Sequence, residues 1–317
     1  KIISLSLPRV LSLSFTQLTV VALTSLASLF TAGSISIFQF AQHLYFVPVG
    51  IFGISYSVAL FPRLNIAYLE RDGDRFFREF FLGLRTILFW IIPSAVLFFV
   101  LRVEIVRVAL GSRSFSWENI QLTAACLGLL TLAMIGASLM PHLVKSFYVL
   151  ENTRVPLFVD MGGSVVSIVL AFAFTKLISH SVFFTGMLTS LLGVSGIAHP
   201  EVLGISLGFS LGLAINVILL CIVLVRFASR VFKRQQLFPV VALLKIVLAS
   251  LAAGIAAHGV HMQFSEVLLH TPTLLIFIHG LTAGIIGLIV YIAALLLLKS
   301  EEMKALGYRL LHACGKC

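Results

Sequence analysis

The chain has 317 residues, of which 60% are hydrophobic and only 11% are charged, and its formal net charge is +10. With a mean hydropathy of +1.11, it has too little polar material to cover a water-soluble globule of this size. The basic residues are spread between apolar stretches instead of forming one stripe, so membrane topology explains the charge better than nucleic-acid binding does. The composition therefore predicts an integral membrane protein with no nucleic-acid partner.

Apolar stretches recur at about the 20-residue length that a helix needs to cross a bilayer, and none alternates with the two-residue period of a barrel strand. We therefore expect an all-α, polytopic protein with about eight transmembrane helices. The expected spans are 5–29, 37–61, 84–101, 122–144, 157–177, 203–225, 238–260 and 274–298.

Lys and Arg alternate along the chain in a way that predicts its orientation. They gather after the second and sixth spans and in the tail, whereas the connections 31–36, 179–201 and 263–273 contain neither residue. By the positive-inside rule, Lys1 and Cys317 are both expected to be cytoplasmic. Arg102, Arg107 and Arg113 interrupt the pattern after the third span, where we expect a short amphipathic segment in the membrane interface.

The second span contains the features that best indicate a working site. Pro48 removes a backbone donor near its middle, and Gly50 and Gly53 follow, so we expect a kink or gating point there. Gln42 and His43 lie just before the kink. An ionisable side chain at this depth faces protein or a wet cavity, so His43 is either a cavity residue or a packing residue between helices.

Other motifs indicate no catalysis. The segment 71–85 mixes charges with Phe pairs, which favours a helix anchored on the inner leaflet before the third span. No Gly-rich phosphate loop, metal-ligand spacing or nucleophile–base cluster is present, and His258 and His261 are interpreted as interfacial. The terminal Cys314 and Cys317 are interpreted as inert. We expect no enzyme activity, no cofactor and no metal.

Four passages together resemble a known family. FYVLENTRVP at 147–156 is similar to the FYA-x-x-D-T-x-T-P signature of the MurJ/MviN family, the lipid II flippases of bacterial cell-wall synthesis. The passages 40–64, 111–127 and 203–220 resemble further segments of that family in the same order and spacing.

The resemblance implies a MATE-like (MOP) transporter fold, of which this chain is the second half. Residues 1–227 would form the C-terminal six-helix lobe, and residues 228–317 two additional transmembrane helices and a short cytoplasmic tail. Because the chain begins at Lys1 without an initiator Met, it looks like a piece of a longer protein whose N-terminal lobe is missing. The implied function is lipid II flipping across the bacterial inner membrane by alternating access, for peptidoglycan biosynthesis. The implied partners are lipid II, or a similar polyprenyl-pyrophosphate lipid, and membrane lipids.

The resemblance also implies that cavity arginines hold the pyrophosphate. Where the family has one of these arginines, this chain has His43, which is mostly neutral near pH 7. The candidate substrate-binding residues are therefore His43, Gln42, Gln17 and Asn216, although Asn216 could equally bond a neighbouring helix.

The sequence indicates ion sites less clearly than it indicates the substrate site. Some family members bind sodium through residues where this chain has Ser167 and Ala171, so no sodium site is expected. Lys145 and Asp160 are expected to form an ion pair, with a proton relay as the alternative.

Two other functions stay open at this point. One is a different MOP-superfamily exporter, of a lipid-linked oligosaccharide or of small amphipathic cations. The other is a non-transporting membrane scaffold.

Overall fold

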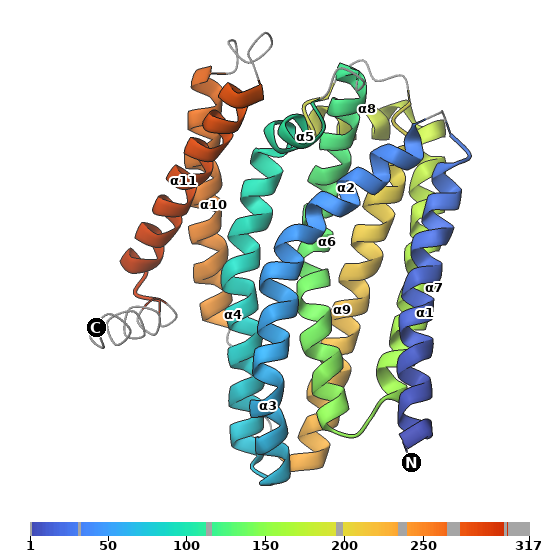
Figure 1. The fold of residues 1–317 in the computed structure, drawn as a ribbon, viewed down its shortest axis with the longest axis vertical. Coiled ribbons are helices and arrows are strands. Elements are labelled where there is room, and N and C mark those ends of the chain that lie inside the picture. Colours follow the sequence, from blue (N-terminus) through green and yellow to red (C-terminus); the bar gives the residue numbers. More distant parts are fainter. Residues whose placement is uncertain are drawn as a thin grey trace.

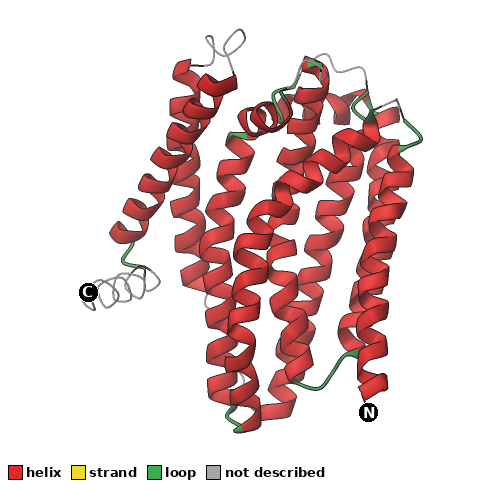
Figure 2. Cartoon of the chain, viewed as in Figure 1, coloured by secondary structure: helices red, strands yellow, loops and turns green. Residues whose placement is uncertain are grey.

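The computed structural model describes residues 2–30, 33–111, 116–194, 199–233, 240–264, 273–300 and 303. Every regular element within these residues is helical, which confirms the predicted all-α class (Figure 2). In chain order, the elements are α1 (Ile2–Ala27), α2 (Ser34–Pro48), the π-helix η1 (Val49–Ile54), α3 (Ser55–Leu69), α4 (Gly73–Val100), α5 (Arg102–Leu110), α6 (Trp117–Val149), α7 (Arg154–His180), α8 (Val182–Leu191), α9 (Val202–Phe232), α10 (Val240–Phe264) and α11 (Thr273–Leu297).

The long helices correspond in order to the predicted spans. In the described part of the chain, seven helical stretches are long and apolar enough to cross a membrane: Ser34–Leu69, Gly73–Val100, Trp117–Val149, Arg154–His180, Val202–Phe232, Val240–Met262 and Leu274–Leu297. α1 corresponds to the first predicted span. It is 26 residues long, and its part Ser14–Ala27 forms a further, shorter apolar stretch.

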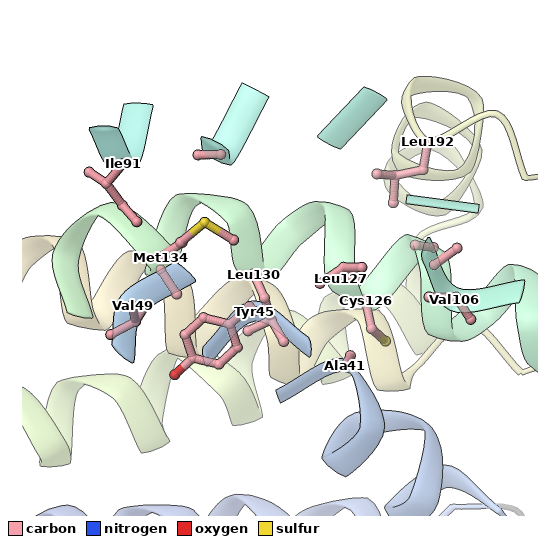
Figure 3. Packing of buried hydrophobic residues seen from close by; sticks show 14 of the residues in the cluster. Ala41, Tyr45, Val49, Ile91, Val106, Cys126, Leu127, Leu130, Met134 and Leu192 are labelled. Atoms are coloured by element: carbon pink, nitrogen blue, oxygen red, sulfur yellow. The ribbon is translucent and has the colours of Figure 1, made fainter. Parts of the chain in front are cut away.

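α6 is the central helix of the bundle. In its most apolar 18-residue stretch 78% of the residues are buried, against 22% to 50% in the other six candidate spans. Leu127, Leu130 and Met134 of α6 pack against Tyr45 of α2 and Ile91 of α4 (Figure 3). Because α6 is covered on most sides, it can be apolar around nearly its whole circumference.

α7 and α9 pack closely because α9 has glycine at every fourth position on one face. A side-chain Cβ at Gly208 would lie 2.2 Å from the backbone nitrogen of Ala171, and one at Gly204 would lie 2.5 Å from that of Thr175. At Gly212 it would lie 2.2 Å from Oγ of Ser167. Small residues at this spacing let the two helix backbones approach, which is how membrane helices gain van der Waals packing.

The start of α4 corrects the expectation of a separate anchor helix at 71–85. Asp72 caps α4 by accepting a hydrogen bond from the backbone N–H of Arg75, 2.9 Å away, and the helix then continues without a break to Val100. Phe76 and Phe77 are fully buried and pack against Phe232 of α9. These rings pack against a neighbouring helix instead of lipid. The segment 71–85 therefore leads into and forms the first part of a membrane-spanning helix.

Two short helices, α5 and α8, lie at one end of the bundle (Figure 1). α5 is the short segment predicted after the third span. The side chain of Arg102 joins α4, α5 and the end of α8, because it donates hydrogen bonds of 2.6 Å to the carbonyls of Phe99 and Leu192. Burial lowers the pKa of Arg102 from its usual value. Arg107 lies over the ring of Trp117, and Arg113 lies outside the described residues.

α10 and α11 pack beside the other helices, on the outer side of α4 (Figure 1). The hydroxyl of Tyr291 in α11 donates a 2.6 Å hydrogen bond to the carbonyl of Phe89 in α4, and the ring is 1% exposed. A Cβ at Gly254 of α10 would lie 2.5 Å from Val96 of α4. A buried hydroxyl with a partner and a close glycine contact together fix how this helix pair sits on α4.

The basic clusters meet at one end of the bundle. The α3–α4 connection, the last turns of α9 and the N-terminus all lie at the end opposite α5 and α8 (Figure 1). Arg63 and Arg75 there pair with Glu79 and Glu70, respectively. Among the described residues, most basic side chains of the connections therefore lie at one end of the bundle, with Arg102 and Arg107 of α5 at the other.

Candidate functional site

The second membrane helix bends at Pro48 but is not interrupted. α2, η1 and α3 form one helical stretch from Ser34 to Leu69, and the six residues directly after Pro48 adopt a π-helix. Single π-helical turns accommodate a disturbed hydrogen-bond ladder and are frequent at functional sites. Figure 1 shows α2 inclined across the bundle and α3 nearly parallel to its axis. A π-helical segment thus follows Pro48, and a gating role for this point stays a prediction.

The two glycines after Pro48 have different surroundings. A Cβ at Gly53 would lie 2.5 Å from Cα of Ser138, so this glycine is required for the close approach of η1 to α6. Nothing lies within 4 Å of the corresponding position at Gly50, and the carbonyl of Gly50 accepts a 3.1 Å hydrogen bond from the Ser55 hydroxyl. Packing explains Gly53, whereas Gly50 lies on an open face where the backbone is accessible.

His43 and Gln42 lie on α2, five and six residues before Pro48. The side chain of His43 is exposed and that of Gln42 is half-buried, whereas Tyr45 on the opposite side is only 6% exposed and packs in the core. His43 is therefore not packed between helices of this chain, which was the alternative interpretation from the sequence. Its place in a substrate cavity stays a prediction.

The structure does not bring all four predicted binding residues together. Gln17 is exposed on α1, but Asn216 is buried between α9 and α7, where its side-chain amide lies 3.5 Å from the carboxylate of Asp160. Asn216 thus serves the contact between helices that the sequence allowed as its alternative role. The Lys145–Asp160 pair stays a prediction.

A groove of about 510 Å³ lies between α1 and α7, and it contains none of the predicted binding residues. Its lining is almost wholly apolar, consisting of Ala22, Ser25, Leu26, Leu29, Ile168, Val169 and Phe172. Such a lining offers no fixed cation for a pyrophosphate. The groove suits an acyl or polyprenyl chain better than a charged headgroup.

The sequence did not indicate a buried histidine in α6. His142 is fully buried, its ring is stacked on Phe80, and its Nε2 lies 3.0 Å from the Phe80 carbonyl of α4. Gly83 leaves room for the ring, since a Cβ there would lie 2.4 Å from Cε1 of His142. This geometry joins α4 to α6 and leaves no access for a substrate. No sequence motif marks it, because its partners are a carbonyl and a glycine on another helix.

A cluster of three side chains that the sequence also did not indicate lies where α5, α10 and α11 meet. One possible ligand atom each from Glu104, His261 and His279 lies within 4.8 Å of the other two. From the sequence, His261 was interpreted as interfacial, and no metal-ligand spacing was expected. The three residues come from helices far apart in the chain, so spacing along the sequence could not reveal them.

Comparison with known proteins gives the family. The family model described as lipid II flippase MurJ matches residues 1–278 of this chain. The chain belongs to the MurJ family. The resemblance recognised from the four sequence passages is therefore confirmed.

Individual MurJ relatives are distant and longer. The lipid II flippase MurJ of Burkholderia cenocepacia is 22% identical over 181 residues, which is 57% of this chain and 35% of that protein. A probable lipid II flippase MurJ of Buchnera aphidicola is 29% identical over 150 residues, covering 47% of this chain and 29% of the relative. The matched part of this chain thus spans about a third of the length of these MurJ proteins.

A solved structure confirms the MurJ-type fold. It is described as lipid II flippase MurJ in an inward closed conformation, and it aligns with a TM-score of 0.68 at 22% identity. The alignment covers 98% of this chain and 54% of the other. At this identity the match establishes the architecture alone, which is a polytopic helical membrane protein corresponding to about half of a MurJ molecule.

Proposed function

We propose that this chain supplies the C-terminal part of a lipid II flippase, which moves the lipid-linked peptidoglycan precursor across the bacterial inner membrane. The observation that carries the proposal is the family match over residues 1–278, which includes both the kinked second span and the α7–α9 contact. The mechanism is alternating access without covalent chemistry, in which rigid helix groups rock around a central substrate.

Helix packing supports the proposed organisation. Residues 1–227 would form one lobe centred on α6, whose last helix α9 extends to Phe232, and residues 228–317 would add the α10–α11 pair, which packs on the outer side of α4. An N-terminal lobe would provide the other wall of the cavity. Both termini of this chain face the cytoplasm, since the basic connections and the start of α1 share one end of the bundle.

His43 is the proposed contact for the pyrophosphate. Its side chain is exposed on α2, close to the π-helical bend, while Gln42 beside it and Gln17 on α1 could donate further hydrogen bonds. A pyrophosphate close to His43 would favour the imidazolium form, which then acts as a partial cation where the family has arginine. Asn216 is left out of this set, because it is buried against Asp160.

The test is movement and binding of labelled lipid II in vesicles that contain this chain assembled with an N-terminal lobe. His43→Ala should weaken lipid II binding by about 1–3 kcal/mol, because a charge-assisted hydrogen bond is lost. His43→Arg should retain or improve binding, since arginine is permanently charged.

The matched control is His180→Ala, which removes an exposed histidine at the end of α7 and should leave binding unchanged. Weaker binding for the Arg variant than for the Ala variant would remove His43 from the site. If the unchanged protein moves no lipid II above the protein-free leak, a scaffold role replaces the proposed transport.

A further inference from the structure

Three helices converge on a group of side chains that the proposed transport does not use. Glu104 is on α5, His261 is in the last turn of α10 and His279 is in the second turn of α11. Their possible ligand atoms lie within 4.8 Å of one another, and the His261 and His279 ring centres are 6.2 Å apart. Gly280 of α11 lies against Glu104, because a Cβ there would be in ordinary van der Waals contact with Cβ of Glu104 at 3.4 Å.

The burial of Glu104 requires a positive partner. Its side chain is only 3% exposed, and one carboxylate oxygen contacts Nδ1 of His261, whose side chain is 27% exposed. An isolated carboxylate is strongly disfavoured when removed from water, so it must be neutralised by a proton, an imidazolium or a metal cation. The guanidinium of Arg102 is on the same helix and interacts electrostatically with Glu104, although its hydrogen bonds go to the carbonyls of Phe99 and Leu192.

The donor set is that of a transition-metal site. Two imidazoles and one carboxylate, with further positions open, are ligands that suit Zn²⁺ and similar divalent ions. In a tetrahedral site with metal–ligand bonds of about 2.0–2.1 Å, the ligand atoms are about 3.3 Å apart. Side-chain rotations that move the ligand atoms by roughly 1–2 Å would therefore bring all three within bonding distance of one ion.

We propose that Glu104, His261 and His279 form a binding site for a divalent transition metal of the zinc type. The ion would fasten the α10–α11 pair to α5, and so to the lobe that contains α6. The site lies at the end of the bundle where α5 and α8 are found, away from the basic clusters (Figure 1). The proposal concerns helix attachment and does not rest on the transported substrate.

The test is titration of the purified chain in detergent with Co²⁺, followed by its visible absorption, and competition by Zn²⁺. We expect one equivalent of Co²⁺ to bind with imidazole ligation. Glu104→Gln, His261→Ala and His279→Ala should each weaken binding by at least about tenfold. His180→Ala, which removes an exposed histidine at the same end of the bundle, is the control and should bind as the unchanged chain does.

A second measurement keeps the test valid if a variant is poorly folded. Zn²⁺ should raise the thermal unfolding temperature of the unchanged chain and of His180→Ala, but not that of Glu104→Gln, because an ion bound only by the folded state stabilises it. Binding should also weaken as the pH falls, because the metal binds only deprotonated ligands. Co²⁺ binding that survives all three substitutions, or no saturable binding at all, would leave only an ion pair between Glu104 and His261 and overturn the proposal.

Discussion

His142 shows that an imidazole deep in this bundle can serve packing alone. It is fully buried, and its ring stacks on the Phe80 ring and lies directly against the backbone at Gly83. Because Nε2 faces the Phe80 carbonyl, it must be the protonated nitrogen that donates this hydrogen bond. His43, which is exposed on α2, is the opposite case. Both residues stand in long apolar stretches of the sequence, so burial separates the two roles better than local composition does.

His142 and Gly83 should be energetically coupled. His142→Ala should lower the free energy of unfolding by about 2–4 kcal/mol, because a hydrogen bond is lost and a cavity is left. Gly83→Ala should also destabilise, since its methyl group would lie 2.4 Å from the buried ring. In the double variant the methyl group fills part of the cavity, so the combined loss should be smaller than the sum. Denaturant titration in detergent measures all three, and strict additivity would contradict this account.

At the scale of helices, the closest contact is between α7 and α9. The glycines Gly204, Gly208 and Gly212 of α9 face backbone or side-chain atoms of α7 at distances that no real Cβ could occupy. Two helices in such contact cannot slide without opening a void, because membrane helices are held together mainly by packing. We therefore expect α7 and α9 to move as one unit in any conformational change.

Replacing one of these glycines should force the two helices apart. Gly208→Ala should destabilise the protein by about 1–3 kcal/mol, the usual cost of inserting a methyl group into a close-packed contact. Gly162→Ala is the matched control, because this glycine is exposed on α7 with nothing within 4 Å of a Cβ. It should be neutral or slightly stabilising, since alanine favours helix more than glycine does. Equal thermal stability of the two variants would show that the glycine contact is not tight.

Helix positions could be predicted from the sequence much better than helix partners. The length of each apolar stretch marks a span, and Pro48 marked the bend before the structure was known. The Phe pairs at 76–81 were misinterpreted as a lipid anchor, because a row of aromatic residues looks the same whether lipid or another helix covers it. Only the position of Phe232 and Phe147 on neighbouring helices shows that protein covers it. The sequence also does not show which helices are neighbours, so it could not place Glu104, His261 and His279 in one cluster.

For the molecule as a whole, the main expectation is its orientation in the membrane. With its four native cysteines replaced by serine, a cysteine at Val182 should react with an impermeant maleimide added to intact cells. A cysteine at Lys233 should react only after the cells are permeabilised. Val182 is 90% exposed at the start of α8, and Lys233 is exposed at the opposite end of the bundle, after α9. The reverse labelling pattern would refute the cytoplasmic placement of both termini.

The π-helical segment η1 also makes the second membrane span sensitive to the number of residues in it. A π-helical turn contains one residue more than an α-helical turn, so deleting one residue from Val49–Ile54 could restore a regular α-helix without breaking the chain. Each residue of an α-helix adds about 100° of rotation. Because the π-turn already absorbs the extra residue, the half of the span that carries His43 would keep nearly its rotation relative to α3 and would only move closer to it along the axis. One residue removed from the regular helix of α3 would instead turn that half, and the imidazole with it, by about 100° relative to the rest of α3.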